Sequence, residues 1–529
     1  MVYGKLYHTL NDDQKEVFDR LVNRENVFIT GNAGTGKSYL VKAYDEYCTE
    51  NGIQLVKTAP TGVAALEIGG ATLHRQFNLK IGLDFDEITS DSVLENKKLQ
   101  FLKRTDVILV DEISMVRMDI FDRLMKILYF ANQSRKQKRK KPIQLIFVGD
   151  FFQLAPVISK EEKPHLNEYY HKDVQDGYCF QSRYWHKNQI HLCNLTKIVR
   201  QSDKDFCQAL DECKEGDAHC LEFLRMHSAK AENPDAIWLC GRNMTADMKN
   251  REGLAKINGK LYQFPATYSG DVTAKDKLCD DDFQCKIGAR VVMLVNGVGY
   301  QNGSMGEIVH IIQEKENVKI YVRILKTKKI VEIEKQRFSK YHYENKTVET
   351  PLFDEEGNPL LSPSGKQKVK RAYVVEKVET GYAEQFPMRI GYAVTIHKSQ
   401  GQTYDAMNLM PEIFANGQLY VALSRCKTID GIYIHGYLSQ RMVMCSEEVL
   451  KFYNHPEGYE FFGSGSSLKT MFVPEKYISV IEQLIVKFDE GKYADILEEL
   501  SEPVQDANRT VERLETSAPK TGWGNMLPH

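Results

Sequence analysis

The chain has 529 residues and a formal net charge of −2, from 70 lysine and arginine residues against 72 aspartate and glutamate residues. Hydrophobic residues make up 42% of it and charged residues 27%, as in a soluble globular protein, and no apolar run reaches the ~18 residues of a membrane span. This composition argues against a membrane protein and against a globally basic surface, so any nucleic acid must bind in a local basic groove. The 11 cysteines are scattered and never spaced C-x-x-C, which indicates reduced thiols.

The pattern of apolar segments predicts an α/β fold with parallel sheets, because β-branched runs alternate with helical patterns. The first block should hold a capped helix and four strands that end in polar residues or glycine. Since the carboxyl ends of parallel strands lie at one edge of a sheet, we expect a single site there. The helix is predicted at 11–23, and the strands at 26–30, 54–59, 106–110 and 143–148. A second block has strands at 237–240, 392–396 and 432–434.

The segment 283–386 has a different sequence pattern, in which short runs of alternating apolar and polar residues are separated by Gly, Asn and Pro turns. This pattern predicts a small β-barrel or hairpin insertion. Its strands are expected at 318–324, 330–333 and 371–375. The C-terminal extension, 441–529, should contain a linker at 463–467, a helix over 475–500 and a disordered polar tail.

Residues 31–38, Gly-Asn-Ala-Gly-Thr-Gly-Lys-Ser, fit the P-loop pattern G-x-x-x-x-G-K-[ST] between a predicted strand and a helix. Backbone N–H groups of such a loop hold phosphates, Lys37 would reach the β- and γ-phosphate oxygens, and the Ser38 hydroxyl would hold Mg²⁺. The predicted nucleotide contacts are Gly31, Asn32, Ala33, Gly34, Thr35, Gly36, Lys37 and Ser38.

Asp111 and Glu112 directly follow the apolar strand at 106–110. Asp111 would hold Mg²⁺ through water, and Glu112 would accept a proton from the attacking water or orient it. The alternative is an acidic turn after a buried strand.

Nine segments, in order, resemble the Pif-one family of superfamily-one helicases with 5′→3′ polarity; RecD-type and Dda-type helicases are its cousins. The agreement in order and spacing extends from about residue 10 to residue 436. Departures are the basic run 135–141, the acidic excursion at 84–91 and everything after about 438. The segments are 10–14, 31–38, 59–65, 69–77, 111–115, 149–157, 195–201, 395–401 and 420–425.

The resemblance implies two RecA-like P-loop lobes with parallel sheets and a small SH3-like β-barrel insertion in the second lobe. The first lobe would be 1–186, with a small wedge insertion around 78–103. The second lobe would be 187–282 and 387–440, interrupted by the barrel at 283–386.

The resemblance also implies roles around the nucleotide. Gln14 would hydrogen-bond the adenine edge, unless it is an ordinary helix-surface glutamine. Gln153 would sense the γ-phosphate or the water, and Arg200 and Arg425 are similar to arginine fingers that reach the γ-phosphate from the second lobe. Without the family match, Gln153 would be taken as a loop residue, and Arg200 and Arg425 as surface charges.

The predicted DNA contacts lie in three of the family-like segments, two on the first lobe and one on the second. By spacing alone, Phe77 fits the core better than a base-stacking role. The contacts are Thr61, Gly62, His74 and Phe77 on the first lobe and Thr395, His397, Lys398 and Ser399 on the second. The basic run 135–141 could be a solvated loop, a DNA phosphate contact or a nuclear localisation signal.

The motifs and the resemblance together predict an ATP-dependent DNA helicase that uses ATP and Mg²⁺. The resemblance implies that it moves 5′→3′ on single-stranded DNA. It would unwind 5′-tailed duplexes in replication, repair or recombination, as a monomeric motor with no membrane contact and unidentified protein partners for the C-terminal extension. We expect a cytoplasmic location in a bacterial or viral host, with nucleus and mitochondrion left open. The alternatives are an RNA-directed superfamily-one helicase and a P-loop ATPase that remodels proteins without unwinding.

Overall fold

The computed structural model divides into two units, residues 1–461 and 462–529, and all described residues belong to the first. The linker, the helix over 475–500 and the tail predicted after residue 462 lie outside the described residues. Among the described helices, none combines the length and apolar character that a membrane crossing requires. The structure describes residues 2–79, 88–197, 203–227, 231–273, 279–300, 302–314, 317–352, 359–360 and 367–454.

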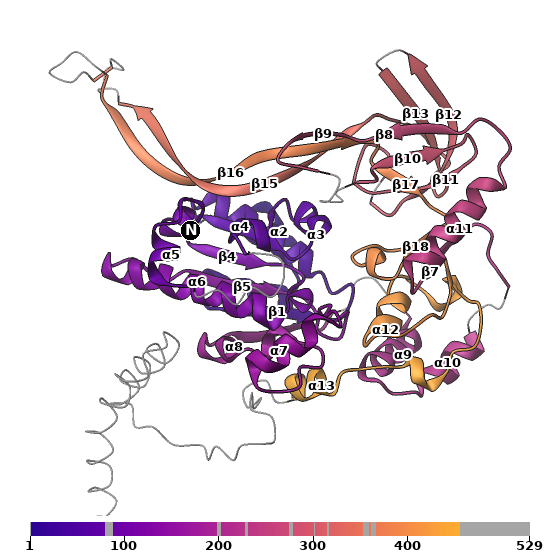
Figure 1. Ribbon diagram of the computed structural model, residues 1–529, viewed down its shortest axis with the longest axis horizontal. Coiled ribbons are helices and arrows are strands. Elements are labelled where there is room, and N and C mark those ends of the chain that lie inside the picture. Colours follow the sequence, from indigo (N-terminus) through magenta and orange to yellow (C-terminus); the bar gives the residue numbers. More distant parts are fainter. Residues whose placement is uncertain are drawn as a thin grey trace, which may run out of the picture. The chain divides into compact units, whose positions relative to one another are not determined.

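A six-stranded parallel sheet, in the order β3-β2-β4-β5-β1-β6, forms the first lobe (Figure 1). Four of its strands match the predicted ones to within one residue. The strands are β1 (Val27–Gly31), β2 (Leu55–Ala59), β3 (Ala71–Thr72), β4 (Val107–Val110), β5 (Gln144–Val148) and β6 (His191–Leu195).

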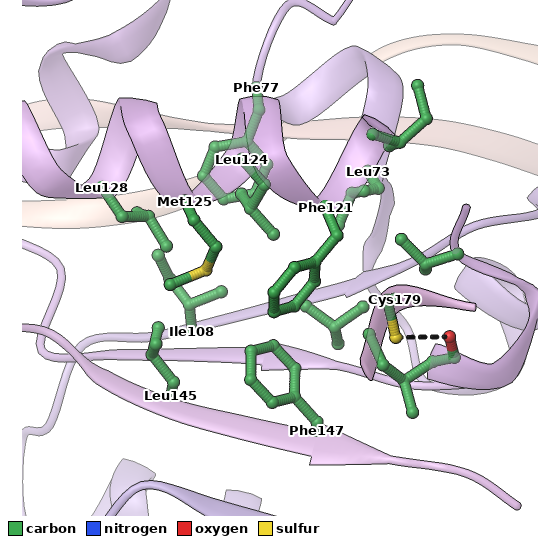
Figure 2. Close-up of a cluster of buried hydrophobic side chains, with 14 of the residues drawn as sticks. Leu73, Phe77, Ile108, Phe121, Leu124, Met125, Leu128, Leu145, Phe147 and Cys179 are labelled. Carbon is green, nitrogen blue, oxygen red and sulfur yellow. Dashed lines mark hydrogen bonds between the residues drawn. The ribbon is translucent and has the colours of Figure 1, made fainter. Parts of the chain in front are cut away.

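Alternate residues of these strands face two different cores, as the two-residue period of a strand requires. Ile108 and Phe147 pack beneath the helix α6, as Figure 2 shows, whereas Leu109 and Ile146 pack with α1 and α2 on the other face. A sheet buried on both faces explains why its strands are continuous apolar runs. The helices of this lobe are α1 (Asp12–Val22), α2 (Lys37–Glu50), α3 (Gly62–Glu67), α4 (Leu73–Gln76), α5 (Ser90–Leu94), α6 (Met118–Gln137), α7 (Glu162–Tyr170) and α8 (Arg183–Lys187), with short 3₁₀ helices at η1 (Lys5–Thr9), η2 (Lys97–Lys103), η3 (Ile113–Met115) and η4 (Cys179–Gln181).

The strand β6 corrects the predicted boundary between the lobes. It pairs in parallel with β1 over five residues and is therefore part of the first lobe, although residues from 187 onward were expected in the second. His191 is exposed while Cys193 is buried, so β6 has the half-buried pattern of an edge strand. Such a pattern does not mark which of two adjacent sheets a strand joins.

The second lobe is a four-stranded parallel sheet in the order β18-β7-β19-β20. One face packs on α9, α10 and α12, and the other carries α11. The strand β19 was not predicted. The elements are β7 (Ile237–Cys240), β18 (Ala393–Thr395), β19 (Met407–Leu409), β20 (Ile432–Ile434), α9 (Lys204–Glu215), α10 (Cys220–His227), α11 (Asn243–Ala255) and α12 (Gln418–Leu423), with η6 (His397–Ser399), η7 (Ile429–Gly431) and η8 (Gln440–Met442) as 3₁₀ turns. Both parallel sheets agree with the predicted α/β class.

Between the strands of the second lobe lie antiparallel sheets, ordered β14-β13-β12-β11-β17, β15-β16-β9 and β10-β8. The barrel closure predicted for this insertion stays a prediction. The strands are β8 (Tyr262–Pro265), β9 (Thr267–Gly270), β10 (Asp282–Cys285), β11 (Arg290–Met293), β12 (Met305–Glu314), β13 (Asn317–Ile324), β14 (Ile330–Ile333), β15 (Gln336–Pro351), β16 (Val369–Gln385) and β17 (Met388–Ile390).

The hairpin of β15 and β16 is much longer than the segment predicted at 371–375, with strands of 16 and 17 residues. It extends across the first lobe (Figure 1), where the Gln76 amide exchanges two hydrogen bonds with the backbone of Tyr343, at 2.7 and 3.1 Å. The Asn345 amide also donates to the Gln100 carbonyl at 2.6 Å, within η2 of the predicted wedge. The insertion of the second lobe is therefore bonded to the first lobe.

The helix α13 (Glu447–Asn454) returns the chain to the first lobe after the second is complete. The ring of Phe452 is 1% exposed and stacks on Phe180 with centroids 4.4 Å apart. The Tyr453 hydroxyl bonds the Thr30 hydroxyl at 2.7 Å and accepts from the Phe151 N–H at 3.3 Å. The start of the C-terminal extension thus completes the first core, which its sequence did not indicate.

We expect Phe452→Ala to lower the free energy of unfolding of the first lobe by roughly 3 to 5 kcal/mol, because a buried aromatic side chain is replaced by a cavity. Urea titration followed by tryptophan fluorescence measures this, since Trp185 lies 5.9 Å from the Phe452 ring. The matched control is Lys451→Ala, on the exposed side of the same helix. A loss as small as that of the control would show that α13 is dispensable for this core.

Candidate functional site

The P-loop joins β1 to α2 and wraps its backbone in conformations that only glycine adopts easily. Gly31 and Gly36 have φ values of +140° and +87°. The φ of Gly36 would strain any residue with a Cβ, and that Cβ would also displace the Gln14 amide nitrogen, which would lie 2.5 Å away. The predicted loop, residues 31–38, is confirmed as a strand–loop–helix turn at the carboxyl edge of the sheet.

Lys37 lies over this loop, where its ammonium donates to the carbonyl oxygens of Gly31 and Asn32 at 2.6 and 3.2 Å. Ser38 is exposed in the first turn of α2. These positions place a cation and a hydroxyl at the mouth of the loop, as a phosphate-binding site requires.

Two carboxylates lie close to Lys37, and a third, that of Glu67, lies close to Asp111. Asp111 and Glu112 follow β4, and the Glu112 N–H donates to the Asp111 carboxylate at 2.9 Å. Burial, and then the charge of Asp111, raise the pKa of Glu112 above its usual range, and burial also raises the pKa of Asp111. Burial and Asp111 raise the pKa of Glu67, at the end of α3, to about 7. Glu67 was not predicted, because its role depends on a contact made in space and not on a motif.

This crowding of negative charge suits a divalent cation. Glu112 has a φ of +50°, a conformation that non-glycine residues seldom adopt and that is found mostly at functional sites. A Mg²⁺ ion held by the Ser38 hydroxyl and, through water, by Asp111 would offset the repulsion, with the nucleotide phosphates as its other ligands.

The amide of Gln400 joins the two lobes at the Glu112 carboxylate. Its nitrogen donates to Glu112 at 3.0 Å and to the side-chain oxygen of Gln153 at 3.1 Å. Gln153 in turn donates to Asp150 at 3.2 Å, so the side chains of four residues form one chain of hydrogen bonds. The structure thus brings the predicted Glu112 and Gln153 together. Gln400 was missed as a site residue, although it lies in the family-like segment 395–401.

Arg425 is buried in the second lobe and held there by its own lobe. Its Nε donates to the Val421 carbonyl at 2.8 Å, and a terminal nitrogen donates to the Ser424 hydroxyl at 2.8 Å. Burial lowers the pKa of Arg425, an effect that the nearby charge of Glu112 opposes. Arg425 is therefore near Glu112, while Arg200 lies outside the described residues.

Two helices of the second lobe contact the P-loop directly. The Ala33 N–H donates to the hydroxyl of Tyr420 in α12 at 3.1 Å. The Asn32 amide donates to Asp211 of α9 at 2.8 Å, and Lys214 donates to the Asn32 oxygen at 3.0 Å. The nucleotide loop thus lies at the junction of the lobes, where a change in the loop can move the second lobe.

Gln14 is buried and forms a capping box with Asn11, the N-cap of α1. Its amide nitrogen also approaches the carbonyls of Thr35 and Gly36, both at 3.4 Å. Gln14 therefore lies against the P-loop, and the alternative that it is an ordinary helix-surface glutamine is wrong. Its recognition of adenine stays a prediction.

On the first lobe, two of the predicted DNA contacts lie at the start of α3, and the other two lie in the segment 69–77. The Thr61 hydroxyl accepts from the Ala64 N–H at 3.2 Å, which caps α3, and Gly62 is the first residue of that helix. His74 is partly exposed, and burial lowers its pKa. Phe77 is 1% exposed and packs edge-on against Phe101 in the core of Figure 2. Base stacking on Phe77 is therefore wrong for this structure, since no face of the ring is free.

On the second lobe, Lys398 is exposed and His397 is partly exposed, so both can reach a strand of DNA. Burial lowers the pKa of His397. Thr395 is buried and accepts from the Lys398 N–H at 3.4 Å, which shapes the turn. The Ser399 hydroxyl is fully buried and donates to the Ile396 carbonyl at 2.7 Å. The predicted DNA contact of that hydroxyl is wrong, because folding already uses it.

Glu112→Gln should stabilise the nucleotide-free protein more at pH 8 than at pH 5. A carboxyl group whose pKa is raised by folding binds its proton more tightly in the folded chain, so stability falls as the pH rises above the unfolded value of about 4.3 toward the raised value. Glutamine does not titrate and escapes this loss. Melting temperatures across this pH range measure the difference, with the exposed Glu447→Gln as control; a pH-independent difference would contradict the raised pKa.

Comparison with known proteins places these features in one family. The family model described as PIF1-like helicase matches residues 9–225. The ATP-dependent DNA helicase PIF1 of Homo sapiens is 30% identical over 466 residues, which cover 84% of this chain and 63% of that protein. The chain thus spans less than two thirds of the human relative. The ATP-dependent DNA helicase Pif1 of Campylobacter jejuni is 30% identical over 471 residues, which cover 82% of this chain and 96% of that protein.

Solved structures agree. Bacteroides sp Pif1 in complex with ADP-AlF4 is 26% identical and aligns with a TM-score of 0.69 over 85% of this chain and 98% of that one. Bacteroides Pif1 bound to ssDNA is 28% identical and aligns with a TM-score of 0.56 over 84% of this chain and 96% of that one. With the P-loop, the carboxylate pair after β4 and the two parallel sheets in place, this chain belongs to the PIF1-like helicase family.

Proposed function

We propose that this protein is an ATP-dependent DNA helicase that moves 5′→3′ along single-stranded DNA and unwinds duplex DNA. The observation that carries the proposal is the Gln400 amide, which bonds Glu112 and Gln153 across the junction of the lobes. A residue of a predicted DNA segment, 395–401, thereby contacts the catalytic carboxylate, so DNA binding and hydrolysis can influence each other. The relatives named above support DNA as the substrate.

Hydrolysis follows from the positions of these residues. Glu112 accepts a proton from water as the water oxygen bonds the γ-phosphorus and the bond to the bridging oxygen of ADP breaks. Lys37 and the loop N–H groups stabilise the charge on the phosphate oxygens. Mg²⁺ held through Ser38 and Asp111 would neutralise further charge on the β- and γ-phosphates. Gln153 orients the water, and Gln14 contacts the adenine.

Movement follows from the junction of the lobes. The γ-phosphate draws Arg425 and, from the 195–201 segment, Arg200 toward the first lobe, and its loss after hydrolysis releases them. Gly62 and His74 on one lobe and His397 and Lys398 on the other hold the strand in turn. We also propose that the motor acts as a monomer in the cytoplasm, in DNA repair or recombination.

The polarity is tested with duplexes that carry a single-stranded tail at the 5′ or the 3′ end. We expect ATP-dependent unwinding of the 5′-tailed DNA duplex and none of the 3′-tailed one, with Lys37→Ala inactive on both because the phosphates lose their cation. An equal rate on both tails would refute the polarity, and faster unwinding of a matched RNA duplex would move the protein to the RNA-directed class. Gel-resolved strand displacement under single-turnover conditions gives the rates.

Arg425→Ala should reduce DNA-stimulated ATP turnover by on the order of 10³-fold, the lower range found for arginine fingers in GTPases. Affinity for a fluorescent ATP analogue should fall much less, because the P-loop holds the nucleotide, and affinity for single-stranded DNA should stay unchanged. The control is Lys427→Ala, an exposed cation paired with Asp405 in the same lobe. Persistent turnover with a collapse of DNA affinity would assign Arg425 to the DNA track instead.

A further inference from the structure

The hydroxyl group of Tyr453 lies where two strands of the first sheet separate. The parallel strands β1 and β5 are paired as far as Ile29, whose carbonyl accepts from the Gly149 N–H at 3.1 Å. One chain then continues into the P-loop, and the other enters the turn that follows β5. Just beyond the pairing, the Tyr453 hydroxyl bonds the Thr30 hydroxyl at 2.7 Å and accepts from the Phe151 N–H at 3.3 Å. A side chain of α13 thus connects the two chains where they separate.

The turn that follows β5, residues 150–153, determines where the side chain of Gln153 lies. The Asp150 carboxylate accepts from the Phe152 N–H at 3.0 Å and from the Gln153 amide at 3.2 Å. The Gln153 N–H also donates to the Asp150 carbonyl at 3.0 Å. Gln153 is in turn part of the chain of hydrogen bonds that ends at Glu112. A displacement of this turn therefore moves the Gln153 amide relative to Glu112.

The other partner of the hydroxyl, Thr30, directly precedes the P-loop. The carbonyl of the first loop residue, Gly31, accepts from the Lys37 ammonium at 2.6 Å. Thr30 and Phe151 are both buried, so water cannot replace the Tyr453 hydroxyl as their partner without a change in packing. A buried N–H group without a partner is costly, and the turn would shift to satisfy it.

The ring of Tyr453 reaches the P-loop by a second route. It stacks on the Phe152 ring, with centroids 4.7 Å apart and an angle of 10° between the planes. The ammonium of Lys214, in α9 of the second lobe, lies 5.1 Å from the centre of the Phe152 ring, within the range of a cation–π contact. Lys214 also donates to the side-chain oxygen of Asn32 at 3.0 Å. Tyr453 is therefore linked to the residues on both sides of Gly31.

The packing around Tyr453 does not itself require a hydroxyl. Its ring lies among aromatic side chains, with centroids 5.3 Å from Phe452 and 6.4 Å from Phe151, and a phenylalanine would fill the same space. Burial, and then the charge of Asp150, raise the pKa of Tyr453, so the hydroxyl keeps its proton. Its oxygen accepts from Phe151, and its proton can be donated to Thr30. Both contacts of the hydroxyl are thus with the chains that lead into the nucleotide site.

We propose that the Tyr453 hydroxyl is a positioning group of the nucleotide site, which holds the turn that carries Gln153 at a fixed place beside the P-loop strand. The start of the C-terminal extension would then set the rate of ATP turnover without contacting the nucleotide. The inference rests on the proposed function, in which Gln153 orients the attacking water. Because a misplacement of about 1 Å near the reacting atoms can cost on the order of 10²-fold in rate, a small shift of the turn is measurable.

The test compares two variants that each remove one hydroxyl group and keep the ring. Tyr453→Phe removes both contacts of the proposed positioning group. The matched control is Tyr170→Phe, which removes a hydroxyl that donates to the Asp122 carboxylate at 2.9 Å in the same lobe. For each variant, kcat and KM for ATP are measured with saturating single-stranded DNA. Affinity for a fluorescent ATP analogue, affinity for single-stranded DNA and the melting temperature are measured alongside.

We expect Tyr453→Phe to lower kcat by roughly tenfold, as for a displacement of a fraction of an ångström, while KM and both affinities change much less. Tyr170→Phe should keep the kcat of the wild type even where its melting temperature falls. A wild-type kcat in Tyr453→Phe, or an equal loss of kcat in both variants, would reduce the hydroxyl to a structural role and overturn the proposal. A higher KM at unchanged kcat would confine the effect to the P-loop and also overturn it.

Thr30→Val tests the same bond from its other end, since valine keeps the shape of threonine and lacks the hydroxyl. Because both substitutions remove one shared bond, the loss of kcat in the double variant with Tyr453→Phe should be smaller than the product of the two single losses. Losses that multiply would show that the two hydroxyls act independently and would overturn the proposal. Any of these failures leaves ATP turnover and unwinding by the wild type intact, whereas failure of the proposed function would abolish both in the wild type itself.

Discussion

The fold holds the Glu112 carboxylate in a position where the charged form of the group is disfavoured. It is enclosed beside Asp111 and Glu67, and its backbone adopts a left-handed conformation with φ at +50°. The hydrogen bond from Gln400 and the charge of Lys37 offset part of this cost. A carboxylate with a raised pKa is a stronger base once ionised, so the crowding that costs stability suits it to accept a proton from water.

The two lobes contact each other at several places besides the chain segments that link their sheets. Tyr420 and Asp211 reach the P-loop from the second lobe, the β15–β16 hairpin bonds Gln76 from the insertion, and Tyr453 returns to Thr30 beneath the P-loop. The P-loop is thus touched by the second lobe and, through β1, by α13. Any change in the loop on nucleotide binding therefore has direct contacts with α9 and α12 of the second lobe.

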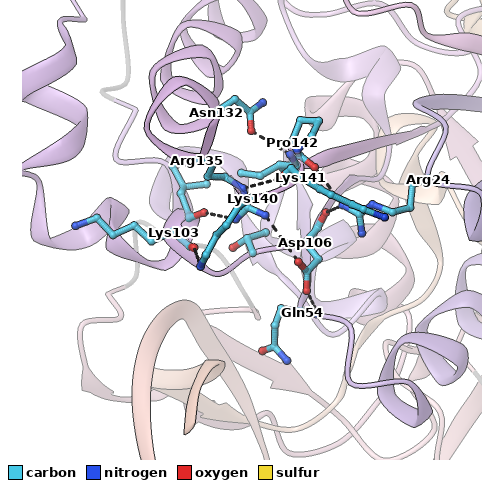
Figure 3. Close-up of polar contacts among 12 residues, drawn as sticks. Arg24, Gln54, Lys103, Asp106, Asn132, Arg135, Lys140, Lys141 and Pro142 are labelled. Carbon is cyan, nitrogen blue, oxygen red and sulfur yellow. Dashed lines mark hydrogen bonds and ion pairs between the residues drawn. The ribbon is translucent and has the colours of Figure 1, made fainter. Parts of the chain in front are cut away.

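Cations of the first lobe differ in what surrounds them. Lys37 lies over the P-loop, and Arg135 lies at the opposite edge of the same sheet, close to Asp106. Arg135 belongs to the basic run 135–141, for which the sequence left open a solvated loop, a DNA phosphate contact and a nuclear localisation signal, yet it is buried and donates to carbonyls of the following loop and of η2 (Figure 3). A run of like charges therefore contains both a structural residue and exposed ones, which its composition alone does not separate.

Local sequence determined four of the six strands of the first sheet, the P-loop, the carboxylate pair after β4 and the family, because each depends on short runs of adjacent residues. Only the tertiary structure decided that β6 joins the first sheet, that Phe77 and the Ser399 hydroxyl are buried, and that β15 and β16 form one long hairpin. It also decided the parts played by Glu67, Gln400 and α13. These outcomes depend on contacts between residues up to hundreds of positions apart, such as Thr30 and Tyr453, and on which polar groups folding leaves exposed. Hydrogen-bond partners and burial are properties of the packed chain, and no spacing of residues along the sequence specifies them.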